Sequence, residues 1–156
     1  MFEVLVTESD FDIAEQYQKL CSGQSKIGAV VTFVGLVRDL NDGDEVTSLE
    51  LQHYPGMTES LIQDILSEAQ QRWQIERAQV IHRVGPLKPS DQIVYIGVAS
   101  AHRKDAFAAA EFIMDYLKTK ATFWKKESGK DQSGQDKSQW LSMKDSDKTA
   151  SNKWQK

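Results

Sequence analysis

Several features that mark common protein classes are scarce in, or absent from, this sequence of 156 residues. Cys21 is the only cysteine, which excludes an internal disulfide and a metal site built from several cysteines. No run of 18 apolar residues is present, so we expect no membrane-spanning segment. The first residues, MFEVLVTESDFD, lack a basic start followed by an apolar block, so we expect no signal peptide and a cytoplasmic protein.

Motifs for common chemistries are also missing. Neither type of Gly-rich phosphate loop occurs. The histidines His53, His82 and His102 lie about 20 to 30 residues apart, which is not a metal-ligand spacing, and the first two fall in expected strands where a structural role is the simpler interpretation. A Ser-His-Asp triad stays open, but no nucleophile-elbow pattern supports it. We therefore expect neither a metal nor a cofactor.

Charge is divided unevenly along the chain. The net charge is −4, yet residues 1–75 carry 4 basic and 13 acidic side chains, whereas residues 76–156 carry 15 basic and 10 acidic ones. Such asymmetry indicates that the second half meets an anion, or that two copies meet through opposite charges. A solvated basic tail is the simpler alternative.

The hydrophobic pattern predicts one α+β domain. A hydrophobic content of 40% suits a single core in a chain of this length. Strands are expected at residues 2–6, 27–38, 46–54, 78–85 and 91–100, with extended structure resuming at 121–127. Helices are expected after Asp10 or Asp12, after a Thr58 cap, and from residue 101 to about 119 after a Ser100 cap. Strands in adjacent pairs with three main helices between them predict a mixed, largely antiparallel sheet.

Three burial predictions follow from the same pattern. Residues 27–38 are apolar on both faces and read as a central strand. In the strand at 46–54, Thr47 should share the buried side with two leucines, Leu49 and Leu51. The first helix should bury a stripe of Ile13, Tyr17, Leu20 and Cys21. Cys21 is therefore interpreted as a core residue rather than a nucleophile.

The composition changes after Glu127. Residues 128–139 contain no apolar residue and predict a mobile loop. Large apolar residues then return, and isolated ones in a polar tail usually dock on something. These residues are Trp140, Leu141, Met143 and Trp154. We therefore divide the chain into a main domain, residues 1–127, and a tail, residues 128–156, that docks on the domain or on a partner.

Cations flank the third helix at both ends. The Ser100 cap places His102 and Arg103 in the first helical turn, where a cation is unfavourable unless an anion is bound; surface salt bridges are the alternative. Lys118 ends this helix, where a cation suits the helix dipole. Arg38 ends the strand at 27–38, a place from which a charged head often lines a pocket.

The stretch YLKTKATFWKKE, residues 116–127, gathers four lysines beside two large aromatic side chains, Phe123 and Trp124. The lysines are Lys118, Lys120, Lys125 and Lys126. An aromatic wall with lysines at its edge suits a flat, anionic ring compound, and it would also suit single-stranded nucleic acid. Simple solubilising charge is the plainer reading.

The length of the third helix adds a constraint. His102 and Lys118 are 16 residues apart, which is about 24 Å along a helix. One straight helix cannot bring both ends to the same small ligand. We therefore predict a homodimer in which His102 and Arg103 of one copy meet Lys118 of the other.

Four blocks of the chain resemble one known family. The segments VVTFVGLVRD, LELQHYPGMTE, VIHRVGPLKPSDQIVYIGVASAHRKDAF and FIMDYLKTKATFWKKE closely resemble the large, catalytic subunits of molybdopterin synthase. The resemblance covers about residues 27–127, in order and without a large gap.

The resemblance implies a dimeric α+β sulfurtransferase of molybdenum cofactor biosynthesis. Such an enzyme adds two sulfurs, as a dithiolene, to cyclic pyranopterin monophosphate and so forms molybdopterin. The sulfur arrives as a thiocarboxylate on the C-terminal Gly-Gly of a small ubiquitin-like partner, and one partner at each end of the dimer makes a heterotetramer. A chain whose lone Cys21 gives it no obvious sulfur to donate fits an external donor.

The resemblance also implies a set of site residues. The family's substrate contacts map onto Arg38, His102, Arg103, Lys118, Lys125, Lys126 and Glu127, with Phe33 and Met114 lining the pocket. Arg38, His102 and Arg103 would hold the phosphate. Lys118 would act where the partner's acyl group meets the substrate, with other cations around it, as a proton-transfer group or transient acyl acceptor. Lys125 would stabilise developing negative charge.

The tail departs from the family pattern. The family carries an arginine a few residues after a tryptophan, whereas here Trp140 is followed by Lys144, which keeps the charge but lacks the planar fork. Two rival functions stay open. One is a single-stranded nucleic-acid binding module, which the pI of 5.4 disfavours, and the other is a non-catalytic scaffold for a ubiquitin-like tail.

Overall fold

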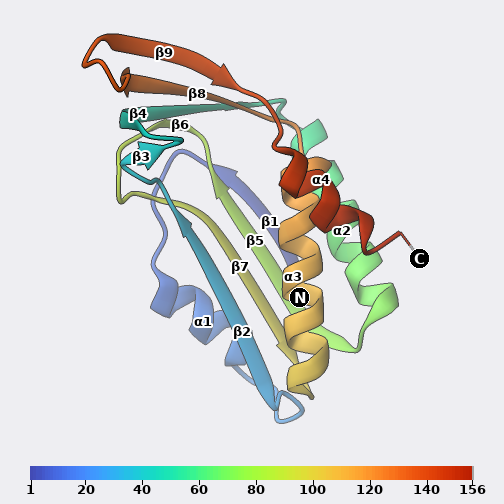
Figure 1. Ribbon diagram of the computed structural model, residues 1–156. Coiled ribbons are helices and arrows are strands. Elements are labelled where there is room, and N and C mark those ends of the chain that lie inside the picture. The colour runs from blue at the N-terminus through green and yellow to red at the C-terminus, as the bar shows by residue number, and fades with distance from the viewer. Residues whose placement is uncertain (156) are drawn as a thin grey trace.

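The computed structural model describes residues 1–155 and shows helices and strands in two regions, one above the other (Figure 1). The strands are β1 (Phe2–Thr7), β2 (Ala29–Leu36), β3 (Leu40–Asn41), β4 (Asp44–His53), β5 (Ile75–Arg83), β6 (Gly85–Leu87), β7 (Gln92–Ser100), β8 (Phe123–Lys130) and β9 (Asp136–Leu141). The helices are α1 (Ile13–Cys21), α2 (Met57–Arg72), α3 (Arg103–Thr119) and α4 (Asp145–Asn152).

The strands form two sheets. The first has the order β1-β5-β7-β2, in which only the β1–β5 pair is parallel. The second has the order β3-β4-β8-β9, with β6 also paired to β4, and all its pairs are antiparallel. Figure 1 places the second sheet across the end of the first. The predicted α+β class with mainly antiparallel pairing is confirmed, although the strands divide over two sheets.

The first sheet is covered on both faces. On one face, α2 and α3 bury side chains such as Leu66 and Phe112 against Val80 and Ile96 of the sheet. On the other face, Leu20 of α1 packs in a smaller cluster with Phe11, Ile81, Tyr95 and Ala99. Full burial of a large apolar side chain contributes roughly 1.5–3 kcal/mol, so the larger α2–α3 layer dominates the core. None of the helices within residues 1–155 has the length and apolar character needed to cross a membrane.

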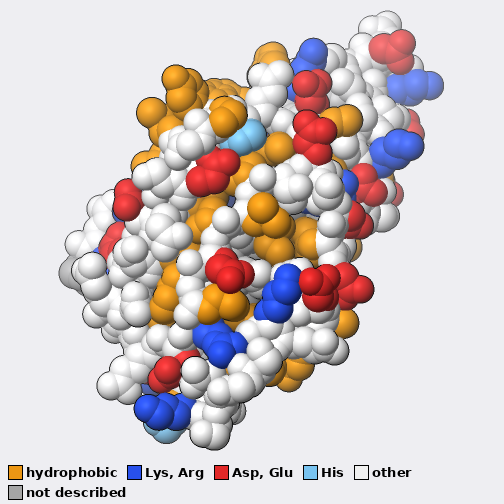
Figure 2. Space-filling view, turned by 180° about the vertical axis from the view of Figure 1, so that it is seen from behind, with side chains coloured by type: hydrophobic (Ala, Val, Ile, Leu, Met, Phe, Trp, Pro, Cys, Tyr) orange, Lys and Arg blue, Asp and Glu red, His pale blue; other side chains and the backbone are white. Residues whose placement is uncertain are grey.

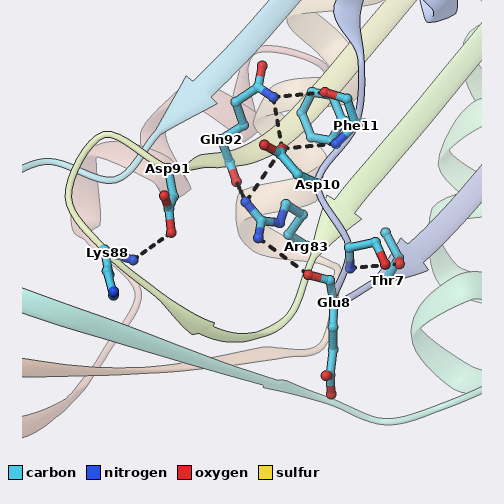
Figure 3. Close-up of polar contacts among 9 residues, drawn as sticks. Thr7, Glu8, Asp10, Phe11, Arg83, Lys88, Asp91 and Gln92 are labelled. Atoms are coloured by element: carbon cyan, nitrogen blue, oxygen red, sulfur yellow. Dashed lines mark hydrogen bonds and ion pairs between the residues drawn. The ribbon is translucent and has the colours of Figure 1, made fainter.

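A polar network fixes the turn between β1 and α1 to the sheet (Figure 3). The guanidinium of Arg83 donates to the carbonyls of Gln92 and Glu8 at 3.0 and 3.3 Å and lies 3.5 Å from the carboxylate of Asp10. The Gln92 amide donates to Asp10 Oδ1 at 2.8 Å, and this bond is the main reason that the pKa of Asp10 lies below its usual value. The ends of β5 and β7 are therefore held at fixed positions.

The prediction that residues 27–38 form a central strand is wrong. β2 is an edge strand, paired only with β7. Phe33 and Leu36 are 42% and 54% exposed. An apolar strand looks the same in sequence whether its own chain or another molecule covers it, so the pattern could not distinguish the two.

The predicted stripe on α1 is also wrong in part. Ile13 and Tyr17 are 40% and 49% exposed, Cys21 is half-buried, and the buried residues are Gln16 and Leu20. The helix is therefore rotated about its axis relative to the prediction, so that Gln16 faces the sheet. Gln79 of β5 explains this rotation, because its buried amide donates to Gln16 Oε1 at 2.8 Å. A buried amide needs such a partner more than a small helix needs another apolar contact.

A bulge in β4 overturns the prediction for Thr47. The register with β8 shifts between Val46 and Ser48, which leaves Thr47 as the extra residue. Its side chain is exposed and donates to the Ser128 carbonyl at 3.1 Å, while Val46, Leu49 and Leu51 are buried. Bulges of this kind interrupt the alternation on which the sequence pattern depends.

Two predicted helix caps are displaced, whereas the cap on α1 is confirmed. Asp12 caps α1 by accepting from Glu15 N at 3.0 Å. Thr58 lies inside α2, after a Gly56 cap with a φ of 82°, and its hydroxyl accepts instead from Tyr54 N. Ser100 ends β7, and His102 is the cap residue of α3, without a side-chain cap bond.

Residues 128–139, predicted as a mobile loop, instead extend the second sheet. β8 continues to Lys130 and pairs with β9, so the proposed boundary after Glu127 falls inside a strand. Both faces of β9 are mostly exposed, which explains why its first four residues, 136–139, are all polar. The tail does dock: the Trp154 ring lies 5.5 and 5.6 Å from the rings of Trp73 and Phe112.

Candidate active site

A cavity of about 540 Å³ lies where the first sheet, the second sheet, the C-terminal end of α3 and the tail meet. Six of the nine site residues expected from the sequence line it. They are Phe33, Arg38, Met114, Lys118, Lys125 and Glu127. The cavity is therefore built from segments that lie far apart in the sequence.

The alternation of β8 decides which lysines face the cavity. Phe123, Lys125 and Glu127 line it, whereas Trp124 and Lys126 do not. Lys126 instead lies on the other face of the sheet, 5.8 Å from the ring of Trp140 on β9. Successive side chains of a strand point to opposite faces, so Lys125 and Lys126 cannot serve the same small ligand within one chain.

Lys125 lies deepest among the cavity's cations. Burial lowers the pKa of Lys125, and the charge of Lys118 lowers it further, while Asp147 and Glu127 oppose the shift. A partly desolvated ammonium with reduced proton affinity is suited to stabilising charge that develops during a reaction, and to moving a proton.

Glu127 is held in place by an amide. Asn41 Nδ2 donates to both Glu127 oxygens at 3.0 and 2.9 Å. The amide oxygen of Asn41 in turn accepts from Lys144 Nζ at 3.4 Å, and this lysine lies 3.5 Å from Asp42 Oδ1. The Glu127 carboxylate is therefore held at a fixed place in the cavity wall, with Lys144 of the tail nearby.

Lys118 has an acidic neighbour, which the expectation of surrounding cations did not include. Its Nζ lies 3.4 Å from Asp147 Oδ1 on α4. The carboxylate is 22% exposed and the lysine side chain 48% exposed. Asp147 also lines the cavity, so the last helix of the chain contributes directly to it.

Arg38 and Phe33 make the opposite wall. Arg38 is exposed and has no hydrogen bond or ion pair to any other residue of the range 1–155. Phe33, Met114 and Phe123 supply apolar surface next to it. A free guanidinium beside an apolar wall suits an anion attached to a flat ring.

His82 also lines the cavity, although its sequence pattern indicated only a structural role. Its ring stacks on Phe123 with centroids 3.8 Å apart, and Nδ1 donates to the Arg83 carbonyl at 2.9 Å. Burial lowers the pKa of His82 to about 3. The imidazole is therefore neutral at physiological pH. His82 has the structural role expected from the sequence and is also part of the cavity wall.

His102 and Arg103 do not reach this cavity. They lie at the other end of α3, are exposed, and have no side-chain partner within the described residues. Figure 1 shows α3 running from the lower end of the first sheet up towards the second sheet, and Figure 2 shows blue and pale blue side chains together at the lower tip of the molecule. The predicted separation of the two ends is thus present in the structure.

Lys120 shows that the four lysines of residues 116–127 do not form one surface. It lies 3.7 Å from the centroid of the Tyr116 ring and 3.4 Å from Glu68 on α2. With Lys126 on the outer face of the second sheet, only Lys118 and Lys125 share a site. This arrangement does not form the continuous basic track that a nucleic-acid strand requires.

Comparisons with known proteins show the family of this chain. The family model described as "MoaE protein" matches residues 6–120. The chain is 53% identical over 152 residues to the molybdopterin synthase catalytic subunit of Vibrio cholerae and 54% identical over 152 residues to that of Haemophilus influenzae, in each case covering 97% of both chains. The structure of a MoaE protein from Burkholderia ambifaria is 43% identical, with a TM-score of 0.82 over 99% of this chain and 98% of that one.

This chain belongs to the MoaE family. The resemblance seen in its sequence is therefore confirmed, and so are the α+β fold and the enzyme class, since the MoaE relatives are molybdopterin synthase catalytic subunits. The match runs from the end of β1 to the end of α3 and so includes β2, β5 and β7 of the first sheet.

In this MoaE chain, three cavity residues were not recognised as site residues from the sequence: Asn41, His82 and Asp147. Lys144, which stands in place of the family's tail arginine, also lines the cavity. His82 lies inside the quoted block VIHRVGPLKPSDQIVYIGVASAHRKDAF, so the resemblance could have drawn attention to it. No sequence pattern could have indicated Asp147 as a site residue, because its position depends on how α4 packs. Within residues 1–155 no cluster of His, Cys, Asp and Glu side chains is arranged to hold a metal ion.

Proposed function

We propose that the cavity binds cyclic pyranopterin monophosphate and that two sulfurs are added to it there to form the molybdopterin dithiolene. The observation that carries this proposal is the convergence of Arg38, Lys118 and Lys125 on one cavity of about 540 Å³ with an apolar wall. Flat heterocycles that carry a phosphate match such a combination of cations and apolar surface.

Two lysines take separate roles in the proposal. Lys125, with its pKa lowered by burial, stabilises the negative charge that develops on oxygen and sulfur as the acyl–sulfur bond breaks. Lys118 meets the acyl group of the sulfur donor. The thiocarboxylate sulfur bonds to a pterin carbon and displaces an oxygen substituent from it. Water then attacks the acyl carbon and breaks the acyl–sulfur bond, which leaves the sulfur on the pterin and a carboxylate on the donor. If the Lys118 amine attacks first as a transient acyl acceptor, water releases the same carboxylate from it.

The phosphate site draws on a second copy of the chain. Arg38 lies at the cavity, while His102 and Arg103 are free at the far end of α3 and cannot reach it within one chain. In a homodimer, these two residues would complete the anion site of the partner copy. The exposed Phe33 and Leu36 on the β2 edge support contact between copies.

The sulfur donor in this proposal is a small ubiquitin-like protein with a C-terminal Gly-Gly thiocarboxylate. Its extended tail would enter the cavity past residues 128–156, and one donor for each copy gives a heterotetramer. The lone Cys21 lies on α1, half-buried and outside the cavity, so it offers no alternative sulfur source there. The reaction is placed in the cytoplasm, with no further cofactor.

The test is a reconstitution. Purified protein is mixed with the thiocarboxylated partner and cyclic pyranopterin monophosphate, and mass spectrometry follows the product. We expect a species that has gained two sulfurs, only when the partner carries the thiocarboxylate. If the partner binds but no sulfur reaches the pterin, the chain is a scaffold and the proposal fails.

A further inference from the structure

Asp147 reaches the cavity from a helix that follows β9 and would otherwise be a polar tail. It sits in the first turn of α4 and lies 3.4 Å from Lys118 Nζ. Its neighbour Asp145, two residues earlier, has a side chain that is 97% exposed and pairs only with Lys148 on the same helix. The two carboxylates of one helical turn therefore have different environments.

The position of Asp147 is set by how α4 is anchored. At the end of the tail, Trp154 Nε1 donates to Asp115 Oδ2 on α3 at 2.7 Å, and Arg72 of α2 donates to the Trp154 carbonyl at 2.7 Å. Lys153 lies 3.1 Å from Asp115 and also pairs with Glu111. These bonds, together with the packing of the Trp154 ring, hold α4 along α3.

The other acid of the cavity is not available to Lys118. Glu127 accepts two bonds from Asn41 and stands near Lys144. Asp147 is therefore the only carboxylate within residues 1–155 that pairs with Lys118. Its charge also acts on Lys125, because Asp147 raises the pKa that burial lowers.

We propose that Asp147 is a positioning residue for the sulfur-transfer site, delivered by the docked helix α4, and that it holds the Lys118 ammonium at the cavity. The proposal rests on the function proposed above. Lysine carries a flexible four-carbon stem, so a fixed carboxylate restricts where its amine can be.

This role predicts a specific kinetic pattern. Asp147→Asn removes the ion pair with little change of shape, so kcat should fall. The same change makes the cavity more positive by one charge, so an anionic substrate should bind as well as before or better, and KM should stay equal or decrease. A merely structural loss of the cavity would instead raise KM.

The experiment compares four variants in the reconstituted reaction. Asp147→Asn should lower kcat roughly fivefold, the scale of a partly exposed ion pair. Asp147→Glu should recover most of the rate, and Asp145→Asn is the matched control on the same turn and should behave like the wild type. Trp154→Ala, which frees α4, should reproduce the kcat loss of Asp147→Asn.

A second readout does not depend on turnover. Acetylation of lysines by a limiting amount of an activated ester is followed by peptide mass spectrometry, with exposed Lys104 as the internal reference. Lys118 should be labelled roughly fivefold faster in Asp147→Asn than in the wild type, because the carboxylate no longer holds the amine.

The outcomes separate the two proposals. An inactive wild type with the expected labelling difference would defeat the proposed function and leave the Asp147 contact standing. Unchanged labelling, an Asp147→Asn enzyme with a wild-type kcat, or a kcat loss matched by a rise in KM and a lower melting temperature would overturn the positioning role.

Discussion

The two ends of α3 differ in whether their charged and polar side chains have partners from the same chain. At the C-terminal end, Lys118 lies in a cavity with Lys125 and an acidic partner, Asp147. At the N-terminal end, His102 and Arg103 are exposed, and the helix cap is not filled by a side chain. Within residues 1–155, the chain thus forms a lined cavity at one end of α3 and leaves His102 and Arg103 without a side-chain partner at the other end.

Helix electrostatics explains why the difference is informative. A cation at the C-terminal end of a helix stabilises it, so Lys118 needs no ligand to justify its place. Cations at the N-terminal end oppose the dipole and leave backbone N–H groups unsatisfied, which an anion would correct. The contrast supports the proposal that the N-terminal end of α3 contributes to a site in another molecule.

The largest expected effect lies at the C-terminal end of α3, where the cavity is. Lys118→Ala or Lys125→Ala should lower the single-turnover rate about 10²–10³-fold, because each removes a charge that acts in the transition state. Lys120→Ala is the control, since Lys120 pairs with Glu68 outside the cavity. Near wild-type rates for both cavity variants would make the two ends of α3 equivalent and refute the assignment.

The N-terminal end should affect binding more than chemistry. Arg103→Ala should weaken the affinity for cyclic pyranopterin monophosphate about tenfold or more, the scale of a lost charge-assisted bond, and Arg103→Lys should recover only part of it. Isothermal titration calorimetry measures this directly. Lys104→Ala, one residue along and equally exposed, should bind as the wild type does; equal losses from both changes would point to general charge rather than a site.

A smaller effect is expected on stability at acidic pH, and it arises at the cavity end, where His82 is buried. The folded protein holds the pKa of buried His82 at about 3, below the unfolded value of 6.5, so His82 contributes stability above pH 6.5 that is lost as the pH falls towards 3. At pH 5 this costs about 2 kcal/mol of the free energy of unfolding. Urea unfolding of the wild type and His82→Gln at pH 7.5 and pH 5 should show a steeper loss in the wild type. Equal losses would mean that His82 is not buried neutral at the cavity end.

Much of the cavity at the C-terminal end of α3 was predictable from the sequence. The resemblance assigned Lys118, Lys125 and Glu127 to one site, and Arg38 was expected at a pocket from its place at the end of the strand predicted at 27–38. The alternation of β8, which separates Lys125 from Lys126, is visible in the sequence but was not applied there. The α+β class could be read from the order of elements, because a single sequence displays local periodicity.

Contacts between distant segments were not predictable. The edge position of β2 depends on what lies beside it, and the extra residue Thr47 depends on the register with β8. β9 is exposed on both faces and so lacks any apolar alternation. The place of Asp147 follows from the docking of Trp154, seven residues later, on helices far away in the sequence.

The most direct test of a site shared between copies is complementation. A double variant, His102→Ala with Arg103→Ala, and the single variant Lys118→Ala are each assayed alone, then mixed and allowed to exchange subunits, with exchange verified by native mass spectrometry of tagged copies. In a shared-site homodimer, each mixed dimer contains one intact site, so about a quarter of the wild-type activity should return. Complete subunit exchange without any recovery of activity would contradict the account.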